Sequence, residues 1–209
     1  MMKRIDFKME AALFDFDGVI MDTEGLYTIF WDGVGSRYLG VEGFGASIKG
    51  QTLTQIFERH LKAVESQWGE ITEALNVYER DMKYQFIPGA AEYLLRLREE
   101  GVPTAIVTSS NEVKMKQVMA QHPELPTMVD RIFTAEYFTK SKPDPQCFLL
   151  GMDTFGSTPA HTVVFEDSFH GLEAGRASGA FVVGLATTNS REAIAPLCDV
   201  VIDDFVGWE

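Results

Sequence analysis

Short apolar runs alternate with amphipathic stretches along most of this chain. Each apolar run has the length expected of a buried strand. The runs cover Ala11–Phe16, Thr104–Thr108, Arg131–Thr134, Thr162–Glu166, Ala180–Leu185 and Val200–Ile202. From about residue 100 onward, strand and helix patterns follow one another, which predicts a parallel sheet with helices on both faces.

Local signals mark the ends of several helices. Gly101 follows an amphipathic stretch and is a good C-terminal signal. Asn111 is a suitable N-cap, and Asp144-Pro145 is typical of an N-cap followed by the first helical residue. The expected helices are Ala90–Glu100, Glu112–His122, Gln146–Phe155 and Gly171–Ser178.

One segment, residues 23–85, breaks this alternation. It contains no convincing strand pattern, and its helical stretches are Thr23–Leu39, Thr52–Glu65 and Glu70–Tyr84. We therefore expect an α/β core of Rossmann-like design, formed by residues 1–22 and 86–209, with an inserted all-helical cap. Because the cap follows the first strand directly, it should lie over the carboxyl ends of the strands, where such sheets bind ligands.

The overall charge limits the function. The chain has 209 residues and a formal net charge of −13, so it offers no basic face for nucleic acid. No apolar run approaches the roughly 18 residues of a membrane span. The N-terminal charges precede no apolar run before Ala11, so we expect a cytoplasmic protein without a secretory signal. No interface pattern stands out, and we expect a monomer or a weak homo-oligomer.

Two acidic residues directly follow the first expected strand. Asp15 and Asp17 are two residues apart, so the strand period places them on the same side. Like charges in this arrangement need a cation or a shared proton. Taken alone, the pattern is equally typical of a polar strand end before a turn at Gly18.

Hydroxyl groups and a lysine end two further segments. Thr108 and Ser109 follow the second strand and precede a helix whose free amides would attract an anion, although a simple N-cap is the alternative. Lys142 precedes a helix held by prolines and would neutralise a phosphate, with a solvated loop lysine as the alternative. Such local cations are needed because the global charge repels phosphate.

A second acidic pair, Glu166 and Asp167, ends the fourth expected strand. Carboxylates gathered from strand ends are suitable ligands for magnesium. The alternative is an acidic pair that caps the next helix.

Taken together, these segments resemble the four motifs of the haloacid dehalogenase-like hydrolase superfamily, in the same order. They read DFDGVIMDTE, VTSSN, SKPDP and FEDSFHGLEAG. The helical insertion after the first motif resembles the small cap of the branch that contains beta-phosphoglucomutases and related phosphatases. The resemblance covers essentially the whole chain.

The resemblance implies a magnesium-dependent phosphatase acting on a small phosphorylated metabolite, such as a sugar or polyol phosphate. Asp15 would be the nucleophile that becomes an aspartyl-phosphate. Asp17 would be the general acid and base, a residue that true dehalogenases lack. Mg²⁺ would be bound by Asp15, by Asp167 and by the backbone carbonyl of Asp17, with Glu166 assisting directly or through water.

The phosphoryl group would then be bound by Thr108, the amide of Ser109 and Lys142. In the cap, Lys49 and Gln51 resemble a substrate-facing loop of sugar-phosphate members, although a solvated loop is equally consistent with the sequence.

Two alternatives remain from the sequence. One is a phosphosugar mutase of the beta-phosphoglucomutase type, but those enzymes carry a histidine and an arginine where this chain has Tyr27 and Leu53. The other is a non-catalytic, ligand-binding member of the family. It would have no need for a nucleophile and an acid together.

Overall fold

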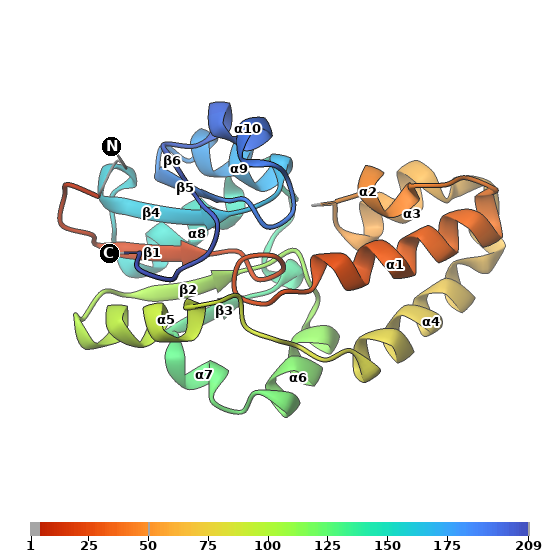
Figure 1. Cartoon of the computed structure of the whole chain (residues 1–209), viewed down its shortest axis with the longest axis horizontal. Helices are drawn as coiled ribbons and strands as arrows, with labels where there is room; N and C mark the ends of the chain where they lie inside the picture. The colour runs from red at the N-terminus through yellow and green to blue at the C-terminus, as the bar shows by residue number, and fades with distance from the viewer. Residues whose placement is uncertain (1–4, 50, 209) are drawn as a thin grey trace.

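Six strands form one parallel sheet in the computed structural model, which describes residues 5–49 and 51–208 (Figure 1). They are β1 (Ala11–Phe14), β2 (Thr104–Val107), β3 (Arg131–Phe133), β4 (Thr162–Glu166), β5 (Phe181–Leu185) and β6 (Val200–Ile202). Their order is β3-β2-β1-β4-β5-β6, as in doubly wound sheets. Leu13 lies opposite Ala105 and Val164, so β1 is central. The expected α/β fold is confirmed, with every strand end within two residues of its prediction.

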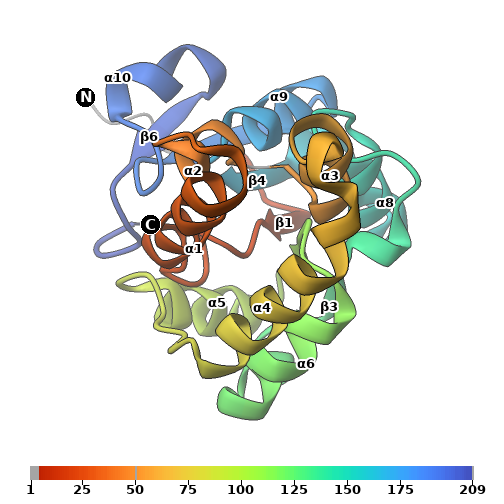
Figure 2. The ribbon, with the colours of Figure 1, turned by 90° about the vertical axis from the view of Figure 1, so that its right-hand side faces the viewer.

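Helices cover both faces of this sheet (Figure 2). Successive side chains of β1 point to opposite faces, so Phe14 packs with one set of helices and Leu13 with the other. The first set is α5 (Ala90–Glu99), α6 (Glu112–Gln121) and α7 (Leu125–Met128). The second set is α8 (Gln146–Phe155), α9 (Phe169–Ala177) and α10 (Arg191–Ile194).

Side-chain caps set several helix ends. Asn111 is the N-cap of α6 as predicted, and its side chain accepts a hydrogen bond from the Lys114 amide at 2.9 Å. The predicted N-cap of α8 is wrong by one residue. Pro145 takes that position, while the Asp144 side chain accepts a bond from the Gln146 amide at 3.0 Å. Helix α9 begins two residues earlier than predicted, because Ser168 is its N-cap.

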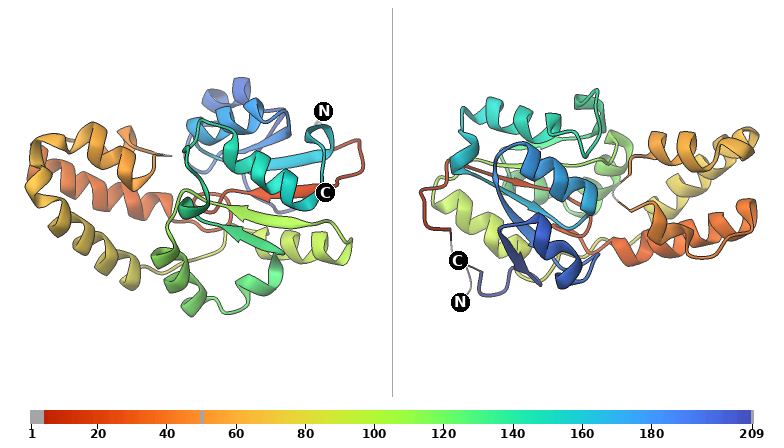
Figure 3. Two further views of the ribbon diagram at one scale, coloured as in Figure 1. Left: turned by 180° about the vertical axis from the view of Figure 1, so that it is seen from behind. Right: turned by 90° about the horizontal axis from the view of Figure 1, so that it is seen from above.

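The inserted segment is helical and has its own core (Figure 1). Its helices are α1 (Glu24–Val34), α2 (Phe44–Ser47), α3 (Leu53–His60) and α4 (Trp68–Asp81), with a π-helical turn at Gly35–Leu39 and a 3₁₀ turn at Lys62–Gln67. Trp31, Phe57 and Leu75 are buried among these helices. The insertion lies beyond the carboxyl end of β1, as expected, and Figure 3 shows it at one end of the molecule.

The chain enters and leaves the cap through neighbouring segments. Met21 and Phe86 form an antiparallel bridge, and the Asp22 amide donates to the Gln85 carbonyl at 2.8 Å. The two chain segments that connect the cap to the core are therefore paired with each other. Paired connections of this kind suit a boundary about which a cap moves as a unit. We therefore propose the predicted division, with residues 23–85 as the cap and the rest as the core.

Three helices have no counterpart among those predicted from the sequence. These are α2, α7 and α10, each a single turn of four residues. A segment of four residues is too short to display a helical period. In the part of the chain that the structure describes, no helix is both long and apolar enough to cross a membrane.

Candidate active site

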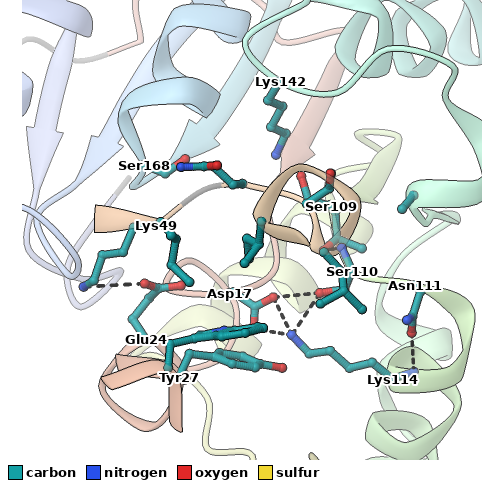
Figure 4. A pocket seen from close by; sticks show the side chains of 18 of the residues that line it. Asp17, Glu24, Tyr27, Lys49, Ser109, Ser110, Asn111, Lys114, Lys142 and Ser168 are labelled. Atoms are coloured by element: carbon teal, nitrogen blue, oxygen red, sulfur yellow. Dashed lines mark hydrogen bonds and ion pairs between the residues drawn. The ribbon is translucent and has the colours of Figure 1, made fainter. Parts of the chain in front are cut away.

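A cavity of about 480 Å³ lies between the carboxyl ends of the strands and the cap (Figure 4). All the residues proposed from the sequence for catalysis, metal binding, phosphate binding and cap specificity line it. They are Asp15, Asp17, Lys49, Gln51, Thr108, Ser109, Lys142, Glu166 and Asp167. The fold thus brings together residues that lie far apart in the chain, although their chemical roles stay predictions.

Lys142 lines this cavity and contacts the ends of three strands, β1, β2 and β4. Its ammonium group lies 2.7 Å from Asp15 Oδ1 and 2.7 Å from Glu166 Oε1, and it donates to the Val107 carbonyl at 3.2 Å. The lysine side chain is only 4% exposed. Burial of an ion pair is tolerated when hydrogen bonds satisfy both partners, and these contacts do so.

Burial changes the proton affinity of this pair. It raises the pKa of Asp15 to about 7, although Lys142 opposes the shift and Glu166 adds to it. For Lys142, burial alone would lower the pKa, but the carboxylates of Asp15 and Glu166 outweigh it and raise the pKa. The two carboxylates therefore favour the charged form of the lysine beside Asp15.

Glu166 is held mainly by the protein. Its Oε2 accepts hydrogen bonds from the Asp167 and Ser168 amides, at 2.8 and 2.9 Å, and from the Ser168 hydroxyl at 3.1 Å. A Cβ atom at Gly171 would lie 1.7 Å from Glu166 Oε1, so only glycine leaves room for this carboxylate. Because Oε2 accepts three hydrogen bonds and Oε1 accepts one from Lys142, Oε1 is the oxygen of Glu166 that keeps capacity for a further partner.

Asp15, Glu166 and Asp167 form an acidic cluster that suits a cation. Each offers a carboxylate oxygen, and these oxygens all lie within 4.8 Å of one another. Burial, reinforced by the neighbouring carboxylates, raises the pKa of Asp167 well above its usual range. Within the described residues, the buried Oδ1 of Asp167 has no hydrogen-bond donor, while its Oδ2 accepts a bond from Thr188. A group of buried carboxylates with an unsatisfied oxygen is a fitting site for Mg²⁺.

Some of the amides before and at the start of α6, which were expected to bind an anion, already have acceptors within the protein. Glu136 accepts hydrogen bonds from the Glu112 amide at 3.0 and 3.2 Å, and Thr108 accepts one from the Ser110 amide at 3.0 Å. Within residues 5–49 and 51–208, the Ser109 amide has no protein acceptor. The helix terminus therefore offers fewer amides to a phosphate than its sequence suggests, and Ser109 is among those left.

Asp17 is bound by three residues that the sequence analysis did not propose for the site. Thr23 donates to it at 2.5 Å, Ser110 at 2.8 Å and the Lys114 ammonium at 2.5 and 2.6 Å. Thr23 and Ser110 lie within the quoted motifs, which is a signal that closer reading could have used. Lys114 carries no such signal, because it stands in an ordinary helix pattern.

The cap side of the cavity carries two further acids, Glu24 and Glu79. Lys49 lies 3.5 Å from Glu24, whose pKa is raised mainly by burial and also by Asp17. Glu79 accepts a hydrogen bond from the Tyr27 hydroxyl at 2.7 Å, and burial raises its pKa as well. These acids were not proposed from the sequence, because single glutamates in helices are usually solvated.

Gln51, the second cap residue proposed from the sequence, is held within the cap. Its Oε1 lies 3.0 Å from His60 Nε2, and its Nε2 donates to the Ser47 carbonyl at 3.4 Å. The side chain still lines the cavity. Its contacts fix the loop that carries it, and its role toward a substrate stays a prediction.

Comparison with known proteins decides the family. A sequence model of the haloacid dehalogenase-like hydrolases matches residues 12–185. The chain therefore belongs to the haloacid dehalogenase-like hydrolase family. This confirms the resemblance of the four motifs and the expected enzyme class, a phosphoric monoester hydrolase of this superfamily.

Relatives of two kinds lie within this family. The hexitol phosphatase A of Escherichia coli (strain K12) is 32% identical over 85% of this chain and 83% of its own length. A beta-phosphoglucomutase of Mycobacterium bovis is 28% identical over 94% of this chain and 90% of its own. The crystal structure of a family IA, variant 3 hydrolase from Entamoeba histolytica has a TM-score of 0.81 at 25% identity, and covers 95% of both chains. The predicted fold, including the cap, is confirmed.

Proposed function

We propose that this protein is a magnesium-dependent phosphatase that hydrolyses a small sugar or polyol phosphate through an aspartyl-phosphate on Asp15. The observation that carries this proposal is the position of Asp15, which lines the cavity 2.7 Å from the Lys142 ammonium group and forms an acidic cluster with Glu166 and Asp167. A buried carboxylate next to cationic groups is suited to attack an anionic phosphoryl group.

In the first step, an oxygen of Asp15 attacks phosphorus and the ester P–O bond breaks. Asp17 gives its proton to the departing alkoxide, which leaves as the alcohol. In the second step, Asp17 takes a proton from water as the water oxygen attacks the aspartyl-phosphate. Inorganic phosphate leaves, and Asp15 is restored as a carboxylate.

The remaining core residues hold the phosphoryl group during both steps. Lys142 offsets its charge, and the Thr108 hydroxyl and the Ser109 amide bond its oxygens. Asp15, Asp167 and the Asp17 backbone carbonyl would hold Mg²⁺, with Glu166 orienting the site through its bond to Lys142. When bound, Mg²⁺ supplies the positive charge that lets a carboxylate approach a phosphate.

The cap side of the cavity supports a neutral, hydroxyl-rich leaving group. Glu24, Glu79 and Gln51 present acceptors that suit hydroxyl groups. A second phosphate placed there would meet the half-buried Glu24 and the buried Glu79, and Lys49 is already paired with Glu24. This arrangement counts against a mutase, which must accommodate a bisphosphate. The named activity of the hexitol phosphatase relative supports the same choice.

A phosphate-release screen over several dozen phosphorylated metabolites, with and without Mg²⁺, tests this function. We expect magnesium-dependent release from sugar or polyol phosphates, and a loss on the order of 10⁴-fold or more in Asp15→Asn, because the nucleophile is removed. Asp17→Asn should slow breakdown of the phosphoenzyme. Near wild-type hydrolysis by Asp15→Asn would contradict the assignment of the nucleophile.

The same screen addresses the alternatives. Isomerisation of a hexose 1-phosphate without net phosphate release would indicate a mutase. Normal magnesium binding without turnover of any ester would indicate a ligand-binding protein. The predicted cytoplasmic location and the monomeric or weakly oligomeric state stay predictions.

A further inference from the structure

Lys114 is a buried lysine to which the proposed chemistry gives no role. Its side chain is only 3% exposed and projects from the first turn of α6 toward Asp17 (Figure 4). Burial of an ammonium group is unfavourable unless its charge is paired and its hydrogens are bonded. A lysine in this position therefore depends on the groups around it, and those groups identify its role.

The surroundings of Lys114 direct it to Asp17. Its Nζ atom lies 2.6 Å from Asp17 Oδ1, 2.5 Å from Asp17 Oδ2 and 2.9 Å from the Ser110 hydroxyl. An ammonium group has three hydrogens, and these contacts use all of them. The rings of Tyr27 and Phe16 lie 4.5 and 5.4 Å from Nζ and stabilise the cation through their faces.

Because Lys114 contacts both carboxylate oxygens of Asp17, it restricts the carboxylate more than a single hydrogen bond would. Thr23 and Ser110 each bond one oxygen of Asp17, and a hydroxyl can rotate to follow a carboxylate as it turns. Lys114 bonds both oxygens with charge-assisted hydrogen bonds, which are stronger than neutral ones. The ammonium group therefore opposes rotation of the carboxylate and fixes its plane.

The aromatic contact extends this arrangement to the cap. Tyr27 belongs to α1, and its hydroxyl donates to Glu79 of α4 at 2.7 Å. Lys114 belongs to the core helix α6, which also packs against α4. Lys114 thus lies where the core meets cap helices α1 and α4, next to the Asp17 carboxylate.

We propose that Lys114 is a positioning residue that orients the Asp17 carboxylate for proton transfer to the leaving oxygen of the substrate and from the attacking water. This inference rests on the proposed function, in which Asp17 is the acid and base. Lys114 acts through Asp17 and does not bind the phosphoryl group. Its contribution therefore depends on how much the leaving group needs a proton.

The test compares two esters with Mg²⁺ present, using single-turnover assays with enzyme in excess for the rate of alcohol release and steady-state assays for KM. The first is the best alkyl phosphate of the screen, with sorbitol 6-phosphate as first choice, and its alcohol needs a proton to leave. The second is p-nitrophenyl phosphate, whose phenolate leaves without one. The variants are Lys114→Met, Lys114→Arg and Lys116→Met. Lys116 is a matched control on the same helix, exposed and paired only with Glu112.

Lys114→Met should slow release of the alkyl alcohol by about 10- to 100-fold, part of the usual contribution of general acid catalysis. Release of p-nitrophenolate should change by less than about threefold, and so should KM for both esters, because phosphate binding is intact. Lys114→Arg should recover part of the lost rate, since its planar fork also reaches two oxygens. Lys116→Met should match the wild type for both esters.

A double-mutant cycle with Asp17→Asn isolates the coupling. If Lys114 acts through Asp17, adding Lys114→Met to Asp17→Asn should leave the alkyl rate unchanged within about twofold. Equal slowing of both esters, a rise in KM for both, or full additivity with Asp17→Asn would overturn the inference. If Lys114→Met does not fold, Lys114→Gln keeps a polar group on a side chain one atom shorter, and the same comparison decides.

The failure of the proposed function would look different. In that case the wild type would release alcohol independently of Asp15, so Asp15→Asn would remain active. Suppose that Asp15→Asn is inactive and that Lys114→Met slows alcohol release equally from both esters. That result would support the proposed function and contradict only the role of Lys114.

Discussion

At the scale of single residues, the buried charges around Asp15 are not balanced by the protein. Asp15 and Glu166 both bind Lys142, and Asp167 lies beside them with a buried oxygen that has no donor among the described residues. When all four side chains are ionised, the cluster is negative, and a divalent cation would neutralise it. Burial raises the pKa of Asp15 and of Asp167, and the neighbouring carboxylates add to both shifts.

Removal of Lys142 should therefore harm both folding and activity. Lys142→Met leaves two buried carboxylates without their cation, so we expect a loss of about 3–5 kcal/mol in the free energy of unfolding. We also expect a fall of about 10²- to 10³-fold in kcat, because a contact to the phosphoryl group is lost. Denaturant unfolding and phosphate release measure the two effects. Lys140→Met is the control, since Lys140 is exposed. An unchanged unfolding midpoint for Lys142→Met would refute the first part.

The glutamates of the cap should determine whether the cavity accepts a leaving group that carries a negative charge. Glu79→Gln keeps the acceptor for the Tyr27 hydroxyl and removes the charge. We expect kcat/KM for a hexose bisphosphate to rise about 10-fold relative to the monophosphate, the effect of about 1.4 kcal/mol of relieved repulsion. Glu73→Gln, on the exposed side of the same helix, is the control. If the ratio of the two kcat/KM values does not move, Glu79 does not face the leaving group.

At the scale of elements, the first turn of α9 is shaped around Glu166. Ser168 caps the helix, and the Asp167 and Ser168 amides that precede it bind the Glu166 carboxylate. Gly171 leaves the space in which this carboxylate lies. The helix therefore serves two purposes, since it covers the sheet through Leu172 and Ala174 and orients an acid of the site.

Two glycine-to-alanine substitutions in helices should have opposite effects. Gly171→Ala places a methyl group on the Glu166 carboxylate and should cost about 1–3 kcal/mol of stability and weaken Mg²⁺ binding. Gly33→Ala in α1 meets no atom within 4 Å and should stabilise the protein by up to about 1 kcal/mol. Thermal unfolding and a Mg²⁺ titration distinguish them. Equal stability of the two variants would show that the packing at Gly171 is not tight.

At the scale of the whole molecule, two separate cores meet at the cavity. The cap has its own buried cluster around Trp31 and Phe57, while the sheet has clusters on both faces. The acids of the site lie between them, in a chain whose net charge is already −13. Self-repulsion of such a chain grows as its carboxyl groups ionise. Cation binding at the cavity should therefore stabilise the whole protein.

The stability of the metal-free protein should fall as the pH rises. Burial raises the pKa of Asp15 from 3.8 to about 7, so between these values the folded state binds more protons than the unfolded state. By linkage, the free energy of unfolding then decreases with rising pH in that window. We expect the Tm in a chelator to be lower at pH 8 than at pH 5.5, and Mg²⁺ at about 100 times its Kd to add about 5–10 °C at pH 8.

The control for this prediction is Asp15→Asn, in which the titrating carboxyl group is absent. Its chelated form should lose less stability between pH 5.5 and pH 8 than the wild type does. Differential scanning fluorimetry in both buffers measures the effect. A chelated wild type that is more stable at pH 8 would contradict the raised pKa of Asp15.

Much of the fold could be predicted because its signals are local. Each strand is a short apolar run. Asn111 marks the start of α6 through its capping side chain, and Gly101 marks the end of α5 because glycine, without a side chain, adopts a positive φ there. The predictions of some other helix boundaries were wrong, or missed short helices, for physical reasons. Pro145, rather than Asp144, holds the N-cap position of α8, and single-turn helices such as α2 are too short to display a period.

The sequence by itself determined the α/β alternation, the place of the inserted cap and the acids, hydroxyls and lysine at the ends of strands. These follow from local patterns, and parallel strands bring their carboxyl ends to one edge. Only the tertiary structure decided that Lys114 reaches Asp17, that Glu79 faces the same cavity and that Glu136 takes an amide of α6. These contacts join helices and loops far apart in the chain, and they depend on how those elements dock, which no local pattern encodes.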